Sequence, residues 1–443
     1  MVGSGSNQKM KGALQGKKIN IMAMGCRSNQ SEADSLASML KRTGAEIVKA
    51  PPYDAAVLIT CTVTAIADKK SRQLLRRLRR QSPEALLVAT GCWAQKADPN
   101  LAQRLGVDLL VGNRQKWQIP SLLNHALGEK RPLPLTIVRN DILHSEEWDH
   151  LFQFQPLLHS RAFVKIQDGC NHFCSYCVIP FVRGKPVSRP LNSVLEEVRS
   201  IADSGCTEVV LTGVHLGLYG QFGEVSLGEL VRQAGAIPGV ERIRFGSLEP
   251  FGINDELLSA LAETPQFCPH LHLPLQSGDD TVLQRMRRGY SPLEYMASVE
   301  RARHYLGSRI HISTDVLVGF PGEDERAFAN TLSFMKEVAF GKVHVFPYSS
   351  REGTRAASFD DHLPRHVVQE RVHKVMEMGE QLFREYCSQW VGEEISVFIE
   401  DAAETGSTGL TPFFVKAVVP QMVSPGRIIK TLTRSYDSEQ LYG

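Results

Sequence analysis

The first part of the chain alternates continuous apolar runs with longer amphipathic stretches. The apolar runs predict buried strands at residues 19–24, 55–60, 85–89 and 107–111. The amphipathic stretches predict helices at residues 32–41, at 65–80 and from about residue 98. Buried strands separated by helices are typical of a parallel sheet covered on both faces, so this segment predicts an α/β sheet domain.

A second alternation of apolar strands and helices begins at residue 161. Its predicted strands are residues 162–166, 208–211, 242–245, 270–275, 311–318 and 342–346. Helical stretches separate them, for example 195–202 and 326–338. Six strand–helix units with right-handed crossovers predict a partial (β/α)6 barrel rather than a closed barrel of eight units.

The last part of the chain changes to a period of two. A long amphipathic helix is predicted at 365–390, and alternating strands follow at 394–400, 411–419 and 427–433. Short alternating strands with glycine-rich turns predict a small C-terminal β-barrel. We therefore expect an α/β protein with three domains, at residues 17–140, 155–385 and 386–443.

Composition limits the kinds of protein and of partner. The 443 residues include 50 lysines and arginines against 48 aspartates and glutamates, so a polyanion must be met by local basic patches. Residues 1–10 are polar and have no apolar core of the kind that a secretory signal needs, and no later run predicts a membrane span. With nine cysteines and no export signal, we expect metal ligands in a reducing cytoplasm rather than disulfides.

Three cysteines lie within eight residues directly after the predicted strand 162–166. Cys170, Cys174 and Cys177 have the spacing C-x3-C-x2-C, and the chain has no other C-x2-C pair. A closed zinc site or a closed cubane needs four ligands. Three thiolates on one loop therefore predict a [4Fe–4S] cluster with one open iron, with zinc completed by His172 as the alternative.

Three further cysteines each follow a predicted strand of the first domain. Cys26, Cys61 and Cys92 lie just past the carboxyl ends of strands 19–24, 55–60 and 85–89. In an open parallel sheet, ligands bind at that edge. The pattern predicts a second three-thiol cluster, and the alternative is three small buried cysteines.

Polar residues and glycines interrupt the carboxyl ends of the barrel strands. The candidates for binding a nucleoside cofactor are Thr212, Gly213, Ser247, Glu249, Gln276, Ser277, Asp315, Gly319 and Pro321. Glycine permits close approach of a backbone, and Glu249 and Gln276 can hydrogen-bond ribose hydroxyls or an ammonium group. The alternative is the ordinary chemistry of strand-to-helix turns.

Two basic segments are candidates for nucleic-acid contact. Residues 69–80 form a basic helix whose buried stripe is Leu74, Leu75 and Leu78, and it follows Cys61 closely enough to hold a phosphate backbone there. A solvated face is the alternative. The second candidate surface combines cations and aromatic residues of the tail, namely Lys416, Arg427, Lys430, Arg434, Phe413, Phe414 and Tyr436.

The cysteine spacing at 170–177 resembles the signature of the radical S-adenosylmethionine (SAM) enzymes. The chain as a whole, from about residue 17, resembles the methylthiotransferases of that superfamily. Residues 25–32, Gly-Cys-Arg-Ser-Asn-Gln-Ser-Glu, match the G-C-x-x-N-Q-x-E pattern of the branch called MtaB. Further agreement lies at residues 90–95, 183–190, 211–217 and 346–349, whereas residues 272–276 are more like sibling branches.

The resemblance implies an N-terminal cluster domain, a radical SAM barrel and a C-terminal RNA-binding domain called TRAM. It implies SAM and two [4Fe–4S] clusters, one on Cys170, Cys174 and Cys177 that cleaves SAM, and one on Cys26, Cys61 and Cys92 that carries the sulfur to be methylated and delivered. The expected reaction is 2-methylthiolation of N6-threonylcarbamoyladenosine next to the anticodon of tRNA. The expected partners are the anticodon stem-loop and a low-potential electron donor of flavodoxin or ferredoxin type.

Two other functions stay open. A sibling enzyme would act on isopentenylated adenosine in tRNA or on an aspartate of a ribosomal protein. A protein of another class would hold Fe–S clusters without catalysis, and would bind RNA or relay electrons.

Overall fold

The structure is a computed structural model that describes residues 14–129, 133–221, 223, 225–404 and 406–443. It divides into two compact units. The first comprises the chain up to Phe173, Cys177–Ser204 and Thr212–Val214. The second comprises Cys174–Tyr176, Gly205–Leu211 and His215–Gly443. We describe each unit by itself.

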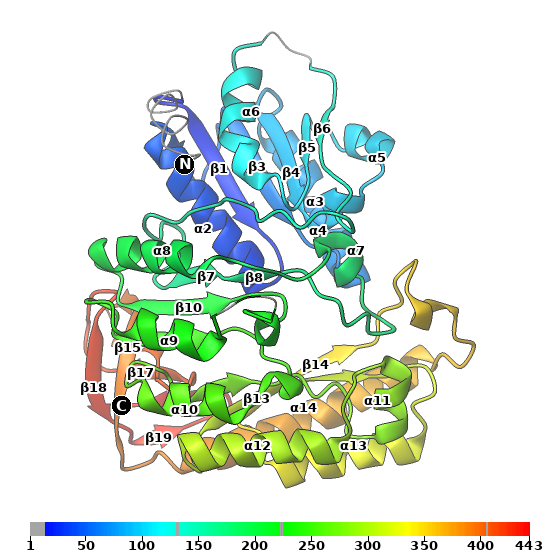
Figure 1. Cartoon of the computed structure of the whole chain (residues 1–443), viewed down its shortest axis with the longest axis vertical. Helices are drawn as coiled ribbons and strands as arrows, with labels where there is room; N and C mark the ends of the chain where they lie inside the picture. Colours follow the sequence, from blue (N-terminus) through cyan, green and yellow to red (C-terminus); the bar gives the residue numbers. More distant parts are fainter. Residues whose placement is uncertain (1–13, 130–132, 222, 224, 405) are drawn as a thin grey trace. The chain divides into compact units, whose positions relative to one another are not determined.

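The first unit contains a six-stranded parallel sheet in the order β2-β1-β3-β4-β5-β6 (Figure 1). The strands are β1 (Lys18–Ala23), β2 (Glu46–Ile47), β3 (Ala55–Thr60), β4 (Leu86–Gly91), β5 (Leu109–Val111) and β6 (Thr136–Val138). The four predicted strands and the parallel α/β fold are confirmed. The prediction missed β2 and β6, because strands of two or three partly exposed residues at the sheet edges leave no apolar run.

Helices cover both faces of this sheet. They are α2 (Arg27–Arg42), α3 (Ala65–Gln81), α4 (Cys92–Lys96), α5 (Pro99–Arg104) and α6 (Ile119–Ala126). Alternate residues of β3 enter two separate cores: Val57 packs with Leu36 of α2, and Leu58 packs with Leu75 of α3. This two-sided burial is why β3 and β4 are continuously apolar.

The first unit also contains the segment that carries two of the C-x3-C-x2-C cysteines. Its elements are β7 (Ala162–Lys165), β8 (Gln167–Asp168), α7 (Ile179–Arg183), β9 (Val187–Ser188) and α8 (Leu191–Asp203). Strand β8 pairs with β9 in antiparallel fashion. Helix α2 packs on β7, and the Lys165 amide donates to the Ser31 hydroxyl at 3.1 Å.

The second unit holds the remaining predicted barrel strands, apart from Thr212. These are β10 (Glu208–Thr212), β11 (Arg242–Phe245), β12 (His270–His272), β13 (His311–Val318) and β14 (Lys342–Pro347). Strands β10 and β11 pair in parallel, as do β12, β13 and β14. The helices between them are α9 (Leu227–Gly235), α10 (Asp255–Glu263), α11 (Asp280–Met286), α12 (Pro292–Leu306) and α13 (Glu325–Val338).

The chain ends with helix α14 (Arg365–Ser388) and a curled six-stranded sheet in the order β18-β15-β16-β17-β20-β19 (Figure 1). Its strands are β15 (Glu394–Ala403), β16 (Gly406–Leu410), β17 (Lys416–Val419), β18 (Ile428–Leu432), β19 (Ser435–Tyr436) and β20 (Gln440–Tyr442). The predicted strand 411–419 is wrong in its first half. There the chain turns, with Phe414 at φ 60° and Val415 donating to the Thr411 hydroxyl.

None of the helices among the described residues combines the length and apolar character that crossing a membrane requires.

Candidate functional site

Cys26, Cys61 and Cys92 lie at the carboxyl ends of three neighbouring strands in the first unit. Cys26 is the residue before α2, Cys61 follows β3, and Cys92 begins α4 after β4. Thr60 and Gly91 are register partners, so Cys61 and Cys92 leave the sheet side by side. The Met24 amide donates to the Ile59 carbonyl, which brings the loop before Cys26 against the same edge.

Two glycines allow this close arrangement. Gly25 has φ +88°, and a Cβ there would lie 2.8 Å from the Cys61 sulfur. Gly91 has φ +93°, and a Cβ there would lie 2.5 Å from the Thr60 carbonyl oxygen. Because L side chains rarely adopt this backbone and have no room here, both Gly-Cys pairs need their glycine.

The three thiols interact through their charges. Burial raises the pKa of the Cys61 thiol to about 12, and the neighbouring Cys92 and Cys26 sulfurs add to that rise. Burial also raises the pKa of Cys92, against the effect of the Arg183 guanidinium. A cationic iron–sulfur cluster would offset this repulsion and hold the sulfurs as thiolates. The three residues therefore fit a cluster.

Cys170, Cys174 and Cys177 are each partly exposed. In the first unit, backbone amides donate to two of the sulfurs: His172 to Cys170 at 3.5 Å and Ile179 to Cys177 at 3.4 Å. Amide donors of this kind stabilise thiolate ligands of an iron–sulfur cluster. Among the described residues, no three His, Cys, Asp or Glu side chains are already gathered around a metal position.

In the second unit, the Cys174 sulfur accepts a hydrogen bond from Arg288, a residue that the sequence analysis missed. The Nη1 of Arg288 lies 3.4 Å from that sulfur, its Nη2 pairs with Glu249, and its Nε donates to the Tyr290 hydroxyl at 3.1 Å. Tyr290 in turn donates to the carbonyls of Pro274 and Leu275. Glu249, predicted to bind a cofactor, is thus linked to a predicted cluster cysteine.

The other predicted cofactor residues differ in what they contact. The Gln276 amide donates to the Asp315 carbonyl at 2.8 Å, so these two are neighbours, and the Asp315 carboxylate lies 3.3 Å from His272. Ser277 is buried, and its hydroxyl accepts from the Asp279 amide just before α11.

The other five predicted residues are constrained by backbone contacts or by burial. Gly319, at φ +74°, donates to Glu323, and Ser247 forms an isolated bridge with His272. The last candidate of the second unit, Pro321, is buried. Of the two candidates in the first unit, Thr212 is buried and Gly213 lies against Gln167.

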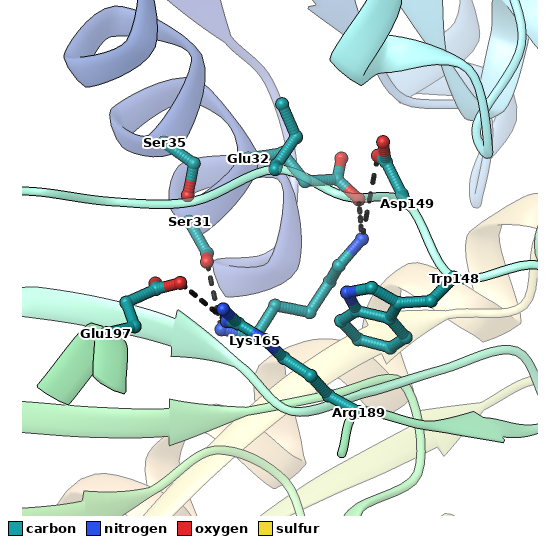
Figure 2. A pocket seen from close by; sticks show the side chains of 9 residues that line it. Ser31, Glu32, Ser35, Trp148, Asp149, Lys165, Arg189 and Glu197 are labelled. Carbon is teal, nitrogen blue, oxygen red and sulfur yellow. Dashed lines mark hydrogen bonds and ion pairs between the residues drawn. The ribbon is translucent and has the colours of Figure 1, made fainter. Parts of the chain in front are cut away.

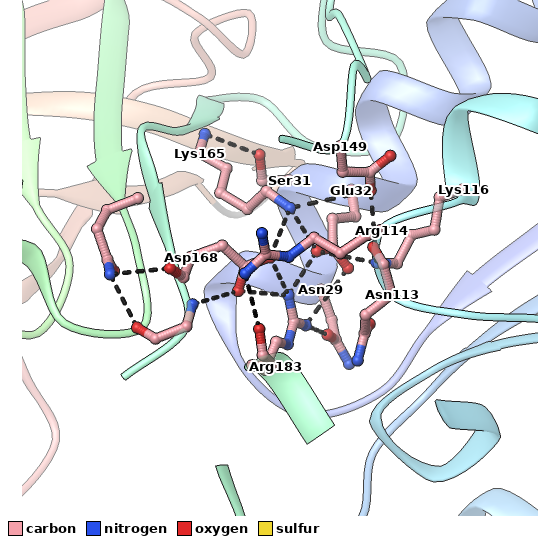
Figure 3. Close-up of polar contacts among 12 residues, drawn as sticks. Asn29, Ser31, Glu32, Asn113, Arg114, Lys116, Asp149, Lys165, Asp168 and Arg183 are labelled. Atoms are coloured by element: carbon pink, nitrogen blue, oxygen red, sulfur yellow. Dashed lines mark hydrogen bonds and ion pairs between the residues drawn. The ribbon is translucent and has the colours of Figure 1, made fainter. Parts of the chain in front are cut away.

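A buried network of charged side chains lies in the first unit (Figure 3), and one of its members, Arg183, contacts the Cys92 thiol. Arg183, at the end of α7, donates to Glu32 at 2.6 Å and to Asp168 at 3.2 Å, and its Nε donates to the Cys92 sulfur at 3.3 Å. The cations Arg183, Lys116 and Lys165 overcome the effect of burial and lower the pKa of Glu32 to about 2. Arg183 was visible in the sequence only as part of the motif at 183–190.

A small polar cavity of about 10 Å³ adjoins this network (Figure 2). It is lined by Ser31, Glu32, Ser35, Trp148, Asp149, Leu151, Lys165, Arg189 and Glu197. Its volume is about what one water molecule needs, and the indole Nε1 of Trp148 is buried there without a protein acceptor. The cavity therefore suits a single structural water rather than a substrate.

Only some of the cations in the basic helix face solvent. Lys69, Lys70, Arg76, Arg77 and Arg80 of α3 are exposed. Arg72 instead pairs with Asp68 at 2.8 Å, and Arg79 pairs with Asp108 at 2.6 Å. Leu75 and Leu78 of α3 are buried and Leu74 is partly buried against the same core, which confirms the predicted stripe.

The predicted aromatic surface of the tail is wrong at Phe413. This ring is 3% exposed and stacks on Trp390 at 3.8 Å between centroids. Phe414 stacks on His270 at 4.7 Å, and Lys430 pairs with Glu394. The period-two pattern predicted a strand but could not show that α14 covers one of its faces.

The chain matches the model of the Radical SAM superfamily over residues 164–335 and that of the Uncharacterized protein family UPF0004 over residues 18–112. It is 37% identical over 404 residues to "Threonylcarbamoyladenosine tRNA methylthiotransferase MtaB" of Chlamydia pneumoniae, covering 91% of each chain. It is 35% identical to the protein of the same name from Bacillus subtilis (strain 168), covering 90% of each.

The chain is also similar to a relative named for a different modified base and to a solved structure. The chain is 32% identical to the "tRNA-2-methylthio-N(6)-dimethylallyladenosine synthase" of Syntrophotalea carbinolica, covering 88% of this chain and 90% of that one. Its fold is similar to the radical SAM methyltransferase TsrM from Kitasatospora setae, with a TM-score of 0.57, 14% identity and 77% coverage of both chains.

The matched regions and the cysteine loop define a radical SAM enzyme, a class that uses SAM and a [4Fe–4S] cluster. The relatives that match nearly the whole chain make the assignment narrower. The chain belongs to the radical SAM methylthiotransferase family.

Proposed function

We propose that this enzyme methylthiolates carbon 2 of N6-threonylcarbamoyladenosine next to the anticodon of tRNA. The relatives at 37% and 35% identity over about nine-tenths of both chains carry a name for that reaction. The G-C-x-x-N-Q-x-E segment at residues 25–32 supports the same branch. Relatives named for the dimethylallyl base are 32% to 35% identical, which makes that base the second candidate substrate.

Cys170, Cys174 and Cys177 are proposed to hold the cluster that works with SAM. When bound, this cluster and SAM supply the radical that removes hydrogen from an adenine carbon too inert for polar chemistry. Arg288 orients the Cys174 sulfur, and the amides of His172 and Ile179 donate to the other two sulfurs. Glu249, Gln276 and Asp315 are the polar residues proposed to bind SAM, together with the backbone at Thr212, Gly213, Ser247, Ser277, Gly319 and Pro321.

Cys26, Cys61 and Cys92 are proposed to hold a second [4Fe–4S] cluster that carries the sulfur. The observation that carries this proposal is the position of three thiols at adjacent strand ends of one sheet, where a Cβ at Gly25 would lie 2.8 Å from the Cys61 sulfur. Structural cysteines in a core need neither the shared edge nor the neighbouring guanidinium of Arg183.

The exposed cations of α3 are proposed to contact the tRNA backbone. The helix begins four residues after Cys61, and five of its exposed side chains are cationic. Phosphate contacts of this kind bind RNA without reading its sequence. The anticodon stem-loop as partner, a flavodoxin or ferredoxin as electron donor, the three domain boundaries and a cytoplasmic location belong to the same proposal.

Mass spectrometry of tRNA nucleosides from a deletion strain tests the substrate. We expect loss of 2-methylthio-N6-threonylcarbamoyladenosine, restored by the intact gene and not by the Cys170→Ala/Cys174→Ala/Cys177→Ala variant. Loss of the 2-methylthio isopentenyl nucleoside instead would transfer the assignment to the sibling reaction. Absence of SAM cleavage by the anaerobic, dithionite-reduced protein would favour a non-catalytic Fe–S protein.

A further inference from the structure

The proposed function leaves a fully buried set of charges in the first unit unexplained. The set consists of Glu32, Arg114, Lys116, Asp149, Lys165, Asp168 and Arg183, none of them more than 5% exposed. Burying a charge costs several kcal/mol unless it is paired. A network of this size is therefore expected to serve a purpose beyond stability.

Arg183 is held in one orientation by its partners. Its Nη1 donates to Glu32 of α2 and to Asp168 of β8, and its Nη2 donates to the Asn29 side-chain oxygen. Because the guanidinium is planar and both of its outer nitrogens are engaged, the Nε–H can point in only one direction. That direction leads to the Cys92 sulfur, 3.3 Å away.

Asn29 extends this contact to the other two cysteine loops. Its side-chain amide donates to the carbonyl of Met24 at 2.5 Å and to that of Thr60 at 3.1 Å. Met24 lies two residues before Cys26, and Thr60 lies directly before Cys61. Arg183 therefore contacts Cys92 directly and, through the Asn29 side chain, the backbone of the loops that lead to Cys26 and Cys61.

The charges of the network do not balance by themselves. Arg114, Lys116, Lys165 and Arg183 are four cations, whereas Glu32, Asp149 and Asp168 are three carboxylates. The network thus has one more cation than it has anions, and the cation nearest the thiols is Arg183. A [4Fe–4S] core of charge 2+ bound by three thiolates carries one net negative charge, which this excess cation would neutralise.

We propose that Arg183 is a positioning residue that orients Cys92 and supplies the counter-charge of the sulfur-carrying cluster. This inference rests on the second cluster of the proposed function. A cation and an N–H···S hydrogen bond both stabilise the more negative, reduced form of a cluster. Arg183 therefore raises the reduction potential of that cluster, and favours its assembly by holding the Cys92 sulfur in place.

A protein that holds only the second cluster allows a direct test. The full chain with Cys170→Ala, Cys174→Ala and Cys177→Ala is reconstituted anaerobically with iron and sulfide, and its potential is measured by a redox titration followed by electron paramagnetic resonance. We expect R183Q to lower the potential and R183K to lower it less. Lysine keeps the charge but lacks the rigid planar set of donors that directs one N–H at Cys92 while another nitrogen binds Glu32 and Asp168.

Arg189 provides the matched control. It is an equally buried arginine of the same unit that pairs with Glu197 at 2.5 Å and donates to Ser193. R189K removes a buried guanidinium of the first unit without altering a thiol contact, so its potential should equal that of the parent protein. If R183K is no different from R189K and the parent, Arg183 has no influence on the cluster and the inference is wrong.

The outcomes separate this inference from the proposed function. If the parent triple variant binds no iron, the second cluster itself is absent and the proposed function fails at that point. If it binds about four irons per chain and the potential is the same in R183K, only the inference fails. If R183Q does not fold, the comparison of the potentials of R183K and R189K still tests the inference.

Discussion

The two units of this enzyme each direct a buried arginine at a predicted cluster cysteine, but they hold it differently. In the first unit, Arg183 donates to Cys92 and is fixed by Glu32 and Asp168, all about 1% exposed. In the second unit, Arg288 donates to Cys174 and pairs with Glu249, whose side chain is 18% exposed.

The difference in exposure between the Glu32 and Glu249 carboxylates indicates that the two residues have different roles. A buried carboxylate surrounded by three cations cannot exchange partners, so the side chains around Arg183 keep one arrangement. A partly exposed carboxylate can leave its arginine for an incoming ammonium group, as SAM binding would require of Glu249.

The largest effect is expected when the buried carboxylate of Glu32 is removed. Glu32→Gln leaves Arg183, Lys116 and Lys165 short of an anion in the core, which should lower the free energy of unfolding by about 3–5 kcal/mol. Urea denaturation of the apo-protein at neutral pH measures it. Glu249→Gln is the control. An equal loss of unfolding free energy in both variants would contradict the proposed difference between the two carboxylates.

Glu32 also predicts that the protein loses stability at acidic pH. Burial would raise the pKa of Glu32, but Arg183 and the two lysines lower it to about 2 from an ordinary value of 4.5. Its contribution, up to about 3 kcal/mol, is therefore complete above pH 4.5 and is lost as the pH falls towards 2. Denaturation from pH 6 to 2 should show a smaller decline for Glu32→Gln than for the wild type.

The exposed carboxylate should matter for cofactor binding instead. Glu249→Gln should weaken SAM binding to the reconstituted protein about ten- to a hundredfold, the loss of a charged hydrogen bond of about 1.5–3 kcal/mol. Calorimetric titration with SAM measures this, and iron content should not change. Unaltered affinity would remove Glu249 from the SAM site.

The smallest expected effect concerns the close approach in the first unit. Gly25→Ala should cost about 1–3 kcal/mol for the left-handed backbone, and should also reduce iron binding, since its Cβ would lie 2.8 Å from the Cys61 sulfur. Gly205→Ala is the matched control, because Gly205 has φ +89° and open space around its Cβ position. If both variants bind iron like the wild type, the glycine is not needed for the site.

Much of this organisation could be predicted from the sequence because it is carried by local patterns. The alternation of strand-like and helical stretches predicted β3, β11 and β13 to the residue, and strand ends placed Cys26, Cys61 and Cys92 on one sheet edge. Strands such as β2, of two residues at an edge, produce no such pattern.

The arginines could not be found in this way because their contacts are long-range. Arg183 is 91 residues from Cys92 and 151 from Glu32, and Arg288 is 114 residues from Cys174. A single cation after a short helix has no periodic signal. Pairing of this kind is visible only once the strands and turns that bring the partners together have been positioned.

Iron and sulfide analysis after anaerobic reconstitution tests the central claim, that two three-thiol sites each hold an open cluster. We expect about eight irons per chain in the wild type and about four in each of the variants Cys26→Ala/Cys61→Ala/Cys92→Ala and Cys170→Ala/Cys174→Ala/Cys177→Ala. About four irons in the wild type, unchanged when Cys26, Cys61 and Cys92 are replaced, would contradict the account, as would zinc at either site.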